Sequence, residues 1–237
     1  MCTVSLVAQP EIQNGFVLTS NRDEINGREN LAPSWEEYLG VQLYFPKDKL
    51  AGGTWLGASE RQRLICLLNG GYKKHERKQP YRKSRGVVVK DFLAALKIDE
   101  VIKNYNLENI EPFTMVIADW QEELTFLEFV WDGVERHRKN LQLTSHIWSS
   151  SPLYSEEMKA QRRQWFEALK SENKPGAEAL LEFHHSAGVG DKNIDLVMDR
   201  GFLKTQSISQ IEKITLGLRF WYKDLANDKV SESILKF

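Results

Sequence analysis

Residues 1–24 read MCTVSLVAQPEIQNGFVLTSNRDE. Cys2 to Ala8 has the composition of a strand, and Asn14-Gly15 is a strong signal for a tight hairpin turn. Phe16 to Ser20 then returns as a second strand. A hairpin brings the end of its second strand back beside the start of its first strand. We therefore expect the polar segment Asn21-Arg22-Asp23-Glu24 to lie next to the N-terminus.

Cys2 would carry two reactive groups once Met1 is removed. Cysteine is small enough for aminopeptidase removal of Met1, which leaves the thiol and a free α-amine on the same residue. The α-amine has an ordinary pKa near ~8, so it can take the thiol proton directly or through a water. Cys2 would then be a nucleophile that contains its own base. The alternative is a small residue that only begins a strand.

The charged segment after the second strand could complete such a site. Asp23 could accept a hydrogen bond from the ammonium of Cys2 and fix its orientation. Arg22 could lower the pKa of the thiol, or it could hold a substrate carboxylate with two parallel hydrogen bonds. The alternative is a solvated charged turn.

Asn69 ends an apolar run, Leu64 to Leu68, and is followed by Gly70-Gly71. An Asn amide at a strand end is a suitable donor to an oxyanion. Glycines beside it would let a substrate approach the backbone closely. The alternative is an ordinary Asn-Gly turn.

The rest of the chain alternates blocks of strands with blocks of helices. Strands are predicted at 54–58, 64–69, 113–118, 124–131, 203–211 and 214–221. Helices are predicted at 87–105, from a cap at Ser155 to about Leu169, and from Pro175 to Phe183. Residues 22–50 and 70–85 are predicted to be irregular. Because strands do not alternate singly with helices, the pattern favours an α+β fold of two packed sheets covered by helices.

Length and composition narrow the class of protein. The chain has 237 residues, 41% of them hydrophobic and 27% charged, with a net charge of −1. We expect one domain over residues 1–237, no nucleic-acid partner and no transmembrane segment. The N-terminus does not resemble a signal peptide, and the two cysteines form no CxxC pair, so we expect a cytoplasmic protein without disulfide, metal or cofactor.

Four segments together resemble a known family. They are Met1-Cys2-Thr3, Asn21-Arg22-Asp23-Glu24, Gly52-Gly53-Thr54-Trp55-Leu56-Gly57 and Leu68-Asn69. They occur in this order and at these spacings in the NRDE family, also called the TANGO2 (transport and Golgi organisation) family. Residues 203–210 resemble its closing strand. Residues 148–151 resemble a Ser-Asn-Ser-like stretch of that family, with Ser150 in place of the Asn.

The resemblance implies a fold and a chemistry. This family is similar to the choloylglycine hydrolase and penicillin V acylase group of N-terminal-nucleophile hydrolases. That similarity implies a four-layer αββα sandwich, removal of the initiator residue and cleavage of a linear amide C–N bond. In that group the Arg and Asp are spaced Arg-x-x-Asp, whereas Arg22 and Asp23 are adjacent here.

The expected site follows from these segments. The catalytic residues are Cys2, Arg22, Asp23 and Asn69, and the substrate-binding residues are Asn21, Trp55, Gly70 and Gly71. The Gly52–Gly57 segment is read as structural first and pocket-forming second. The substrate would be a small-molecule amide or an acyl compound.

Two other features remain. From Lys73 to Arg85 there are seven Lys or Arg residues against Glu76, which suits a solvated loop or a lid that attracts an anionic substrate. His184-His185 ends a predicted helix, where surface or capping roles are expected. Cys66 is expected in the core.

The sequence therefore favours a cysteine amidohydrolase. The main alternative is a protein on the same fold that binds or carries haem or an acyl lipid, because a fold does not determine its function. A third possibility is an interaction module without pocket chemistry.

Overall fold

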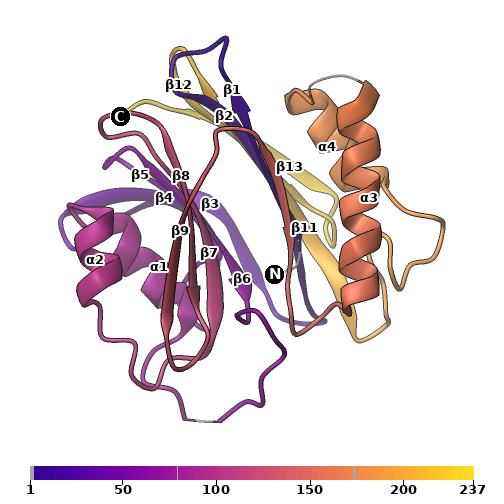
Figure 1. Cartoon of the computed structure of the whole chain (residues 1–237), viewed down its shortest axis with the longest axis horizontal. Helices are drawn as coiled ribbons and strands as arrows, with labels where there is room; N and C mark the ends of the chain where they lie inside the picture. The colour runs from indigo at the N-terminus through magenta and orange to yellow at the C-terminus, as the bar shows by residue number, and fades with distance from the viewer. Residues whose placement is uncertain (1–2, 79, 173–174) are drawn as a thin grey trace. The chain divides into compact units, whose positions relative to one another are not determined.

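The structure is a computed structural model that describes residues 3–78, 80–172 and 175–237. It contains two compact units. Unit 1 comprises residues 1–27 and 143–236, and unit 2 comprises residues 28–142 and 237. Each unit has one antiparallel sheet and one pair of helices, so the α+β class with two antiparallel sheets is confirmed (Figure 1).

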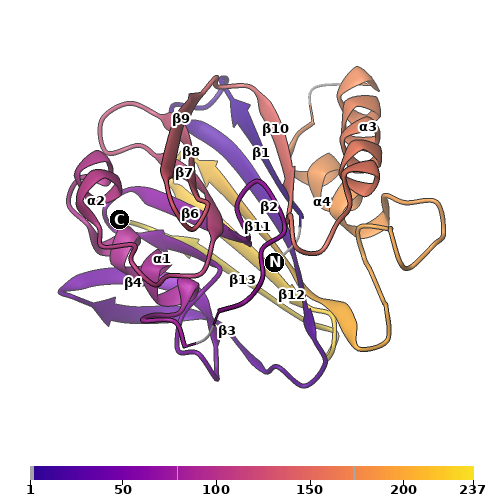
Figure 2. The same cartoon turned by 60° about the horizontal axis from the view of Figure 1, so that its bottom comes forward.

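The sheet of unit 1 has the strand order β10-β1-β2-β11-β12-β13 (Figures 1 and 2). Its strands are β1 (Thr3–Gln9), β2 (Gly15–Ile25), β10 (Ser145–Ser149), β11 (Leu203–Ile214), β12 (Gly217–Asp224) and β13 (Lys229–Leu235). Helices α3 (Glu156–Glu172) and α4 (Ala177–Ser186) pack on one face of this sheet. The packing centres on Val7, Val17, Phe166 and Leu180, which are buried together.

The predicted β1–β2 hairpin is confirmed, with a longer turn than expected. Gln9 pairs with Gly15, so the loop spans residues 10–14. Asn14 takes a left-handed φ of 54°, which Asn tolerates better than most residues. A Cβ on Gly15 would lie 2.4 Å from the Gln9 carbonyl oxygen, so only glycine fits where the strands converge.

The sheet of unit 2 runs in chain order from β3 to β9. Its strands are β3 (Asn30–Tyr38), β4 (Val41–Asp48), β5 (Leu56–Ser59), β6 (Arg63–Asn69), β7 (Phe113–Asp119), β8 (Thr125–Trp131) and β9 (Arg136–Leu141). Helices α1 (Arg85–Ala94) and α2 (Ile98–Asn104) belong to this unit. Val88, Phe92 and Leu93 of α1 are buried with Ile65 and Phe129 of the sheet.

Three predictions of secondary structure need correction. Residues 22–50 are not irregular, because β2 continues to Ile25 and β3 and β4 follow it. Strand β3 is an edge strand with a largely exposed, charged sequence, so it lacks the apolar alternation that identifies a strand. The predicted helix 87–105 is two helices. The helix predicted to begin at Pro175 is α4, which begins at Ala177 with Gly176 as its cap. The predicted cap at Ser155 is confirmed, since its hydroxyl accepts from the Met158 amide.

The Gly52–Gly57 segment has a structural explanation. A Cβ on Gly53 would lie 2.4 Å from the carbonyl carbon of Gly86, and the Thr54 amide donates to the Gly86 carbonyl at 3.2 Å. Helix α1 therefore begins directly against this backbone. The Thr54 hydroxyl also lies 2.7 Å from the carbonyl oxygens of both Pro46 and Leu56, and it can donate its one proton to either.

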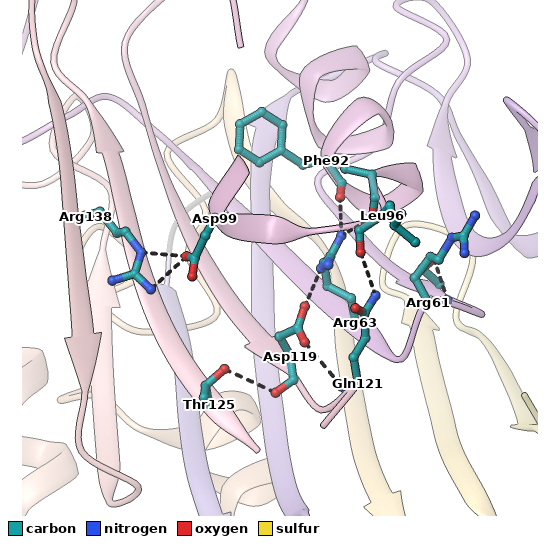
Figure 3. Close-up of polar contacts among 11 residues, drawn as sticks. Arg61, Arg63, Phe92, Leu96, Asp99, Asp119, Gln121, Thr125 and Arg138 are labelled. Atoms are coloured by element: carbon teal, nitrogen blue, oxygen red, sulfur yellow. Dashed lines mark hydrogen bonds and ion pairs between the residues drawn. The ribbon is translucent and has the colours of Figure 1, made fainter. Parts of the chain in front are cut away.

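A buried arginine joins the end of α1 to the sheet of unit 2 (Figure 3). The Arg63 side chain is fully buried, and its Nε lies 2.6 Å from Asp119 Oδ2. Its Nη1 donates to the carbonyls of Phe92 and Ala95, each at 2.8 Å. These carbonyls lie at the end of the helix, where backbone acceptors lack helical partners and cations are favoured.

Replacing Arg63 by methionine is expected to lower the free energy of unfolding by about 3 kcal/mol, because it leaves the buried Asp119 carboxylate unpaired. Arg138→Met is the matched control. Arg138 pairs with Asp99 at 2.9 Å in the same region, but both side chains are exposed, so a loss below about 1 kcal/mol is expected. Urea unfolding of both variants checks this, and equal losses would contradict it.

Candidate active site

The start of β1 lies inside the sheet of unit 1 rather than at its edge. Thr3 pairs with Asn21 of β2 on one side and with Ser149 of β10 on the other. The Thr3 and Ser149 hydroxyls are 3.3 Å apart. Cys2 lies outside the described residues. The residue that follows it is held between two strands, one of which carries the predicted segment Asn21-Arg22-Asp23.

Neighbouring residues of this segment point to opposite faces of the sheet, because side chains alternate along a strand. Asn21 and Asp23 point to the face that α3 and α4 cover, since their partners are residues of α4 and of the segments around it. Arg22 points to the other face, where it pairs with Glu24 at 3.5 Å. The side chains of Arg22 and Asp23, although adjacent in sequence, therefore cannot both contact a group that lies on one face of the sheet.

Asn21 is completely buried, and its amide is used within unit 1. Its Nδ2 donates to the carbonyls of His184 and Leu196 at 3.0 and 2.8 Å. Its Oδ1 lies 2.5 Å from His184 Nδ1. Because Nδ2 is the donor of this amide, Oδ1 accepts, and His184 Nδ1 carries the proton. His184 Nε2 then accepts from the Ser5 hydroxyl at 2.9 Å.

The expected surface or capping role is therefore wrong for His184. It is fully buried between α4 and the β1–β2 hairpin, whereas His185 is partly exposed and contacts the Trp221 ring. Burial lowers the pKa of His184 to about 3, helped by the positive charge of Arg162. The imidazole is neutral and its tautomer is fixed, so it serves as a rigid link to β1 and β2. The sequence signal was ambiguous, because a His pair at a helix end is usually exposed.

Two hydroxyl groups hold the Asp23 carboxylate, which is 2% exposed. The Tyr154 hydroxyl donates to Oδ2, and the Thr205 hydroxyl donates to Oδ1 at 2.5 Å. The register of β11 against β2 shifts between Thr205 and Ser207, which marks a β-bulge at this point. Bulges re-aim side chains next to functional sites. Here the strand irregularity sets Thr205 opposite Asp23.

Arg162 of α3 is a residue that the sequence reasoning missed. It is 1% exposed, and its Nη1 donates to the Thr3 hydroxyl at 2.6 Å. Its Nη2 donates to the carbonyls of Ile194 and Asp195, each at 3.0 Å. A signal was present, because position 162 continues the apolar stripe of α3 that begins at Met158. A charge on an apolar stripe requires a buried polar partner.

The opposite face of the sheet carries polar groups next to Arg22. Arg22 pairs with Ser207 of β11, and Ser209 pairs with Ser20 and Tyr222. These side chains are buried, and the Ser209 hydroxyl has no hydrogen-bond partner among the described residues. Burial raises the pKa of Tyr222. This polar row can donate hydrogen bonds to a bound group, and the alternating serines of β11 were its only sequence signal.

The other predicted site residues lie in unit 2. Asn69 is half-buried at the end of β6, and the Trp55 carbonyl accepts from the Leu67 amide at 2.7 Å. Gly70 has a left-handed φ of 82°, a conformation that favours glycine. A Cβ on Gly71 would lie 3.1 Å from the Asp132 Cα. Both glycines thus have a local structural role. The structure groups these four residues at one strand end and groups Asn21, Arg22 and Asp23 at another.

The basic loop, Lys73 to Arg85, is anchored to unit 2. Glu111 is 7% exposed and lies 3.1 to 3.3 Å from basic nitrogens of His75, Arg77 and Arg85. Arg82 donates to the carbonyls of Asn106 and Glu108, and Lys83 pairs with Asp91 at 2.9 Å. Arg77, Lys83 and Arg85 therefore pair with carboxylates of unit 2, and Arg82 binds backbone carbonyls there, which suits a docked loop better than an open lid.

No metal-binding cluster is found in the described parts of the chain, where no three His, Cys, Asp or Glu side chains gather. Cys66 is fully buried, as expected of a core residue. None of the described helices is long and apolar enough to cross a membrane.

Comparison with known proteins agrees with the motifs. The family model described as "Transport and Golgi organisation 2" matches residues 1–213. The chain belongs to this family. No curated protein matches the sequence.

Three of the solved structures that are similar to this chain are named as enzymes. A variant of conjugated bile acid hydrolase from Clostridium perfringens has a TM-score of 0.62 and 11% identity, covering 98% of this chain and 92% of that chain. Penicillin V acylase from Agrobacterium tumefaciens has a TM-score of 0.58 and 11% identity, covering 99% and 86%. The N-acylethanolamine-hydrolyzing acid amidase ortholog of Caenorhabditis elegans has a TM-score of 0.59 and 11% identity, covering 88% and 92%. The fold of this family member is thus that of the N-terminal-nucleophile hydrolases.

Proposed function

We propose that this protein is a cysteine amidohydrolase that cleaves a linear amide C–N bond, with Cys2 as its N-terminal nucleophile after removal of Met1. The similar structures are named as hydrolases and acylases of conjugated or N-acylated compounds, which supports an amide substrate. We infer the substrate class to be a small molecule or an acyl compound with an amide bond.

The pairing of β1 with β2 is the observation that carries this proposal. Thr3, the first described residue of β1, is opposite Asn21, which directly precedes Arg22 and Asp23. We infer that loss of Met1 frees an amine within reach of the Asp23 carboxylate, on the same residue as the thiol.

The proposed reaction uses residues on both faces of the sheet of unit 1. The amine takes the proton of the Cys2 thiol, and the thiolate attacks the amide carbonyl carbon. Arg22 favours the thiolate, and a backbone N–H stabilises the oxyanion. Asn69 stays the side-chain oxyanion donor that the sequence predicts. The protonated amine gives its proton to the leaving nitrogen as the C–N bond breaks. Water then attacks the thioester, gives up its proton to the amine, and releases the acid and the thiol.

Asp23 and Asn21 take separate roles in this proposal. Asp23 orients the ammonium. Asn21 holds β2 in position, because its side-chain amide donates hydrogen bonds to the carbonyls of His184 and Leu196. A role in positioning β2 therefore replaces the direct contact with substrate that the sequence suggested. Trp55, Gly70 and Gly71 remain proposed as substrate neighbours.

Trapping the acyl-enzyme tests this function. Protein expressed from its own start codon is incubated with a panel of N-acyl amides and a β-lactam, quenched in acid and digested for peptide mass spectrometry. We expect an acyl adduct on the Cys2 peptide, without Met1, and none on the buried Cys66. A folded protein that forms no adduct with any probe, but shows a Soret shift on titration with haem, would favour the binding protein.

A further inference from the structure

Unit 1 contains two buried charged side chains that contact one tyrosine, a guanidinium at its ring and a carboxylate at its hydroxyl. The guanidinium carbon of Arg162 lies 3.6 Å from the centroid of the Tyr154 ring, and the Tyr154 hydroxyl donates to the Asp23 carboxylate. All three side chains are at most 3% exposed. A tyrosine stacked on a cation is a better donor, because the positive charge polarises its O–H bond.

The charge of Arg162 meets neutral groups in the described part of the chain. Its hydrogen bonds go to the Thr3 hydroxyl and to two backbone carbonyls, and its Nε has no partner among the described residues. Arginine stays protonated in proteins, so this is a buried positive charge that costs desolvation energy. Stability alone does not explain it, because a hydrophobic residue would fill the same position on α3.

The field of Arg162 already acts on one neighbour. Its positive charge contributes to the lowered pKa of His184, which also touches the β1–β2 hairpin. Any basic group close to Thr3 would lose proton affinity for the same reason, since a like charge disfavours the protonated form.

We propose that Arg162 and Tyr154 are positioning residues that tune the N-terminal amine: they withdraw charge from the Asp23 carboxylate and thereby favour the free amine that can act as a base. An unscreened Asp23 would hold the ammonium too strongly, and the amine could not take the thiol proton. This inference rests on the proposed function, because it assigns the amine its role as base.

The other charged groups near Asp23 do not replace this pair. Arg200 lies 5.5 Å from the centroid of the Tyr154 ring, farther than Arg162, and its nitrogens bind the carbonyls of Leu153 and Asn193. Arg22 and Glu24 of the same strand point to the other face and pair with each other. His184 is neutral.

The amine can be titrated without turnover. The Cys2→Ala protein is produced with residue 2 at its N-terminus by cleavage of a leader, and acetic anhydride labels the amine over a pH series. Peptide mass spectrometry then gives the pH of half-maximal labelling rate. In this background, Arg162→Gln is expected to raise that pH by about one unit, and Tyr154→Phe by about half a unit.

Two further variants separate tuning from folding. Arg162→Lys keeps the charge, so its midpoint is expected to stay closer to that of the parent than the midpoint of Arg162→Gln. Tyr105→Phe is the matched control, since Tyr105 also donates its hydroxyl to a partly buried carboxylate, Asp91, but in unit 2. It is expected to leave the midpoint unchanged. Tyr154→Phe removes one oxygen only and decides the matter if Arg162→Gln does not fold.

Folded Arg162→Gln and Tyr154→Phe proteins with the midpoint of the parent would overturn the inference, as would a lowered midpoint in Tyr154→Phe. These outcomes are independent of catalysis. An unchanged midpoint beside an acyl adduct on Cys2 would leave the proposed function standing. A raised midpoint in a protein that acylates with no probe would reject the function and keep the electrostatic coupling.

Discussion

Cys2→Ala is expected to reduce amide turnover by roughly 10⁴-fold or more while the protein keeps its fold, because removal of a catalytic nucleophile removes the covalent pathway. The alanine keeps the backbone of residue 2, and the polar contacts of Thr3, Asn21 and Asp23 remain. Near-UV circular dichroism and the unfolding midpoint would check the fold. Turnover is measured on whichever N-acyl amide acylates the wild type.

Two variants complete this test. Cys2→Ser keeps an N-terminal nucleophile of lower reactivity near neutral pH, so most of the rate should be lost. Cys66→Ala removes the other thiol, which is buried in the core of unit 2, and is expected to keep the turnover of the wild type. Undiminished turnover in Cys2→Ala would end the nucleophile assignment.

Acid is expected to destabilise the protein through His184. The pKa of this side chain is about 3 in the folded state and about 6.5 when unfolded, so the unfolded chain binds the extra proton. The stability from the neutral imidazole is complete above about pH 7 and is lost as pH falls through 6.5 toward 3. At 1.36 kcal/mol for each pH unit, the loss reaches about 3 kcal/mol by pH 4.

The comparison variant is His184→Asn, which keeps a donor toward Asn21 Oδ1 but cannot titrate. Urea unfolding at pH 7 and pH 4 should show a smaller pH dependence in this variant than in wild type. His185→Gln is the control, because His185 is only half-buried and should leave most of the dependence in place. Equal pH dependence in wild type and His184→Asn would show that His184 does not titrate in this way.

The parts of the fold that the sequence predicted are those with strong local signals. The β1–β2 and β5–β6 hairpins carry apolar strands between turn residues, and the Ser155 cap marks the start of α3. Strands β3 and β13 were not predicted because both are edge strands with mostly exposed side chains. Their formation depends on pairing with a neighbouring strand, which a local pattern does not reveal.

The same distinction applies to the candidate site, where residues with a local sequence signal were predicted and residues with distant partners were not. Asn21, Arg22 and Asp23 were found because a hairpin brings them beside the N-terminus. Arg162 and His184 were not assigned to it because their partners, Thr3, Ser5 and Asn21, are about 160 to 180 residues away in sequence. That the side chains of Arg22 and Asp23 point to different faces of the sheet follows from strand geometry. That residues 1–237 act as one domain stays a prediction.

The proposed mechanism requires Cys2 to become the first residue and to carry both nucleophile and base. The intact mass of untagged protein, expressed from its own start codon, tests this most directly. We expect a mass lower than that of the full sequence by one methionine, which exposes the amine beside the thiol. Quantitative retention of Met1 would leave Cys2 without its base and would rule out the proposed mechanism.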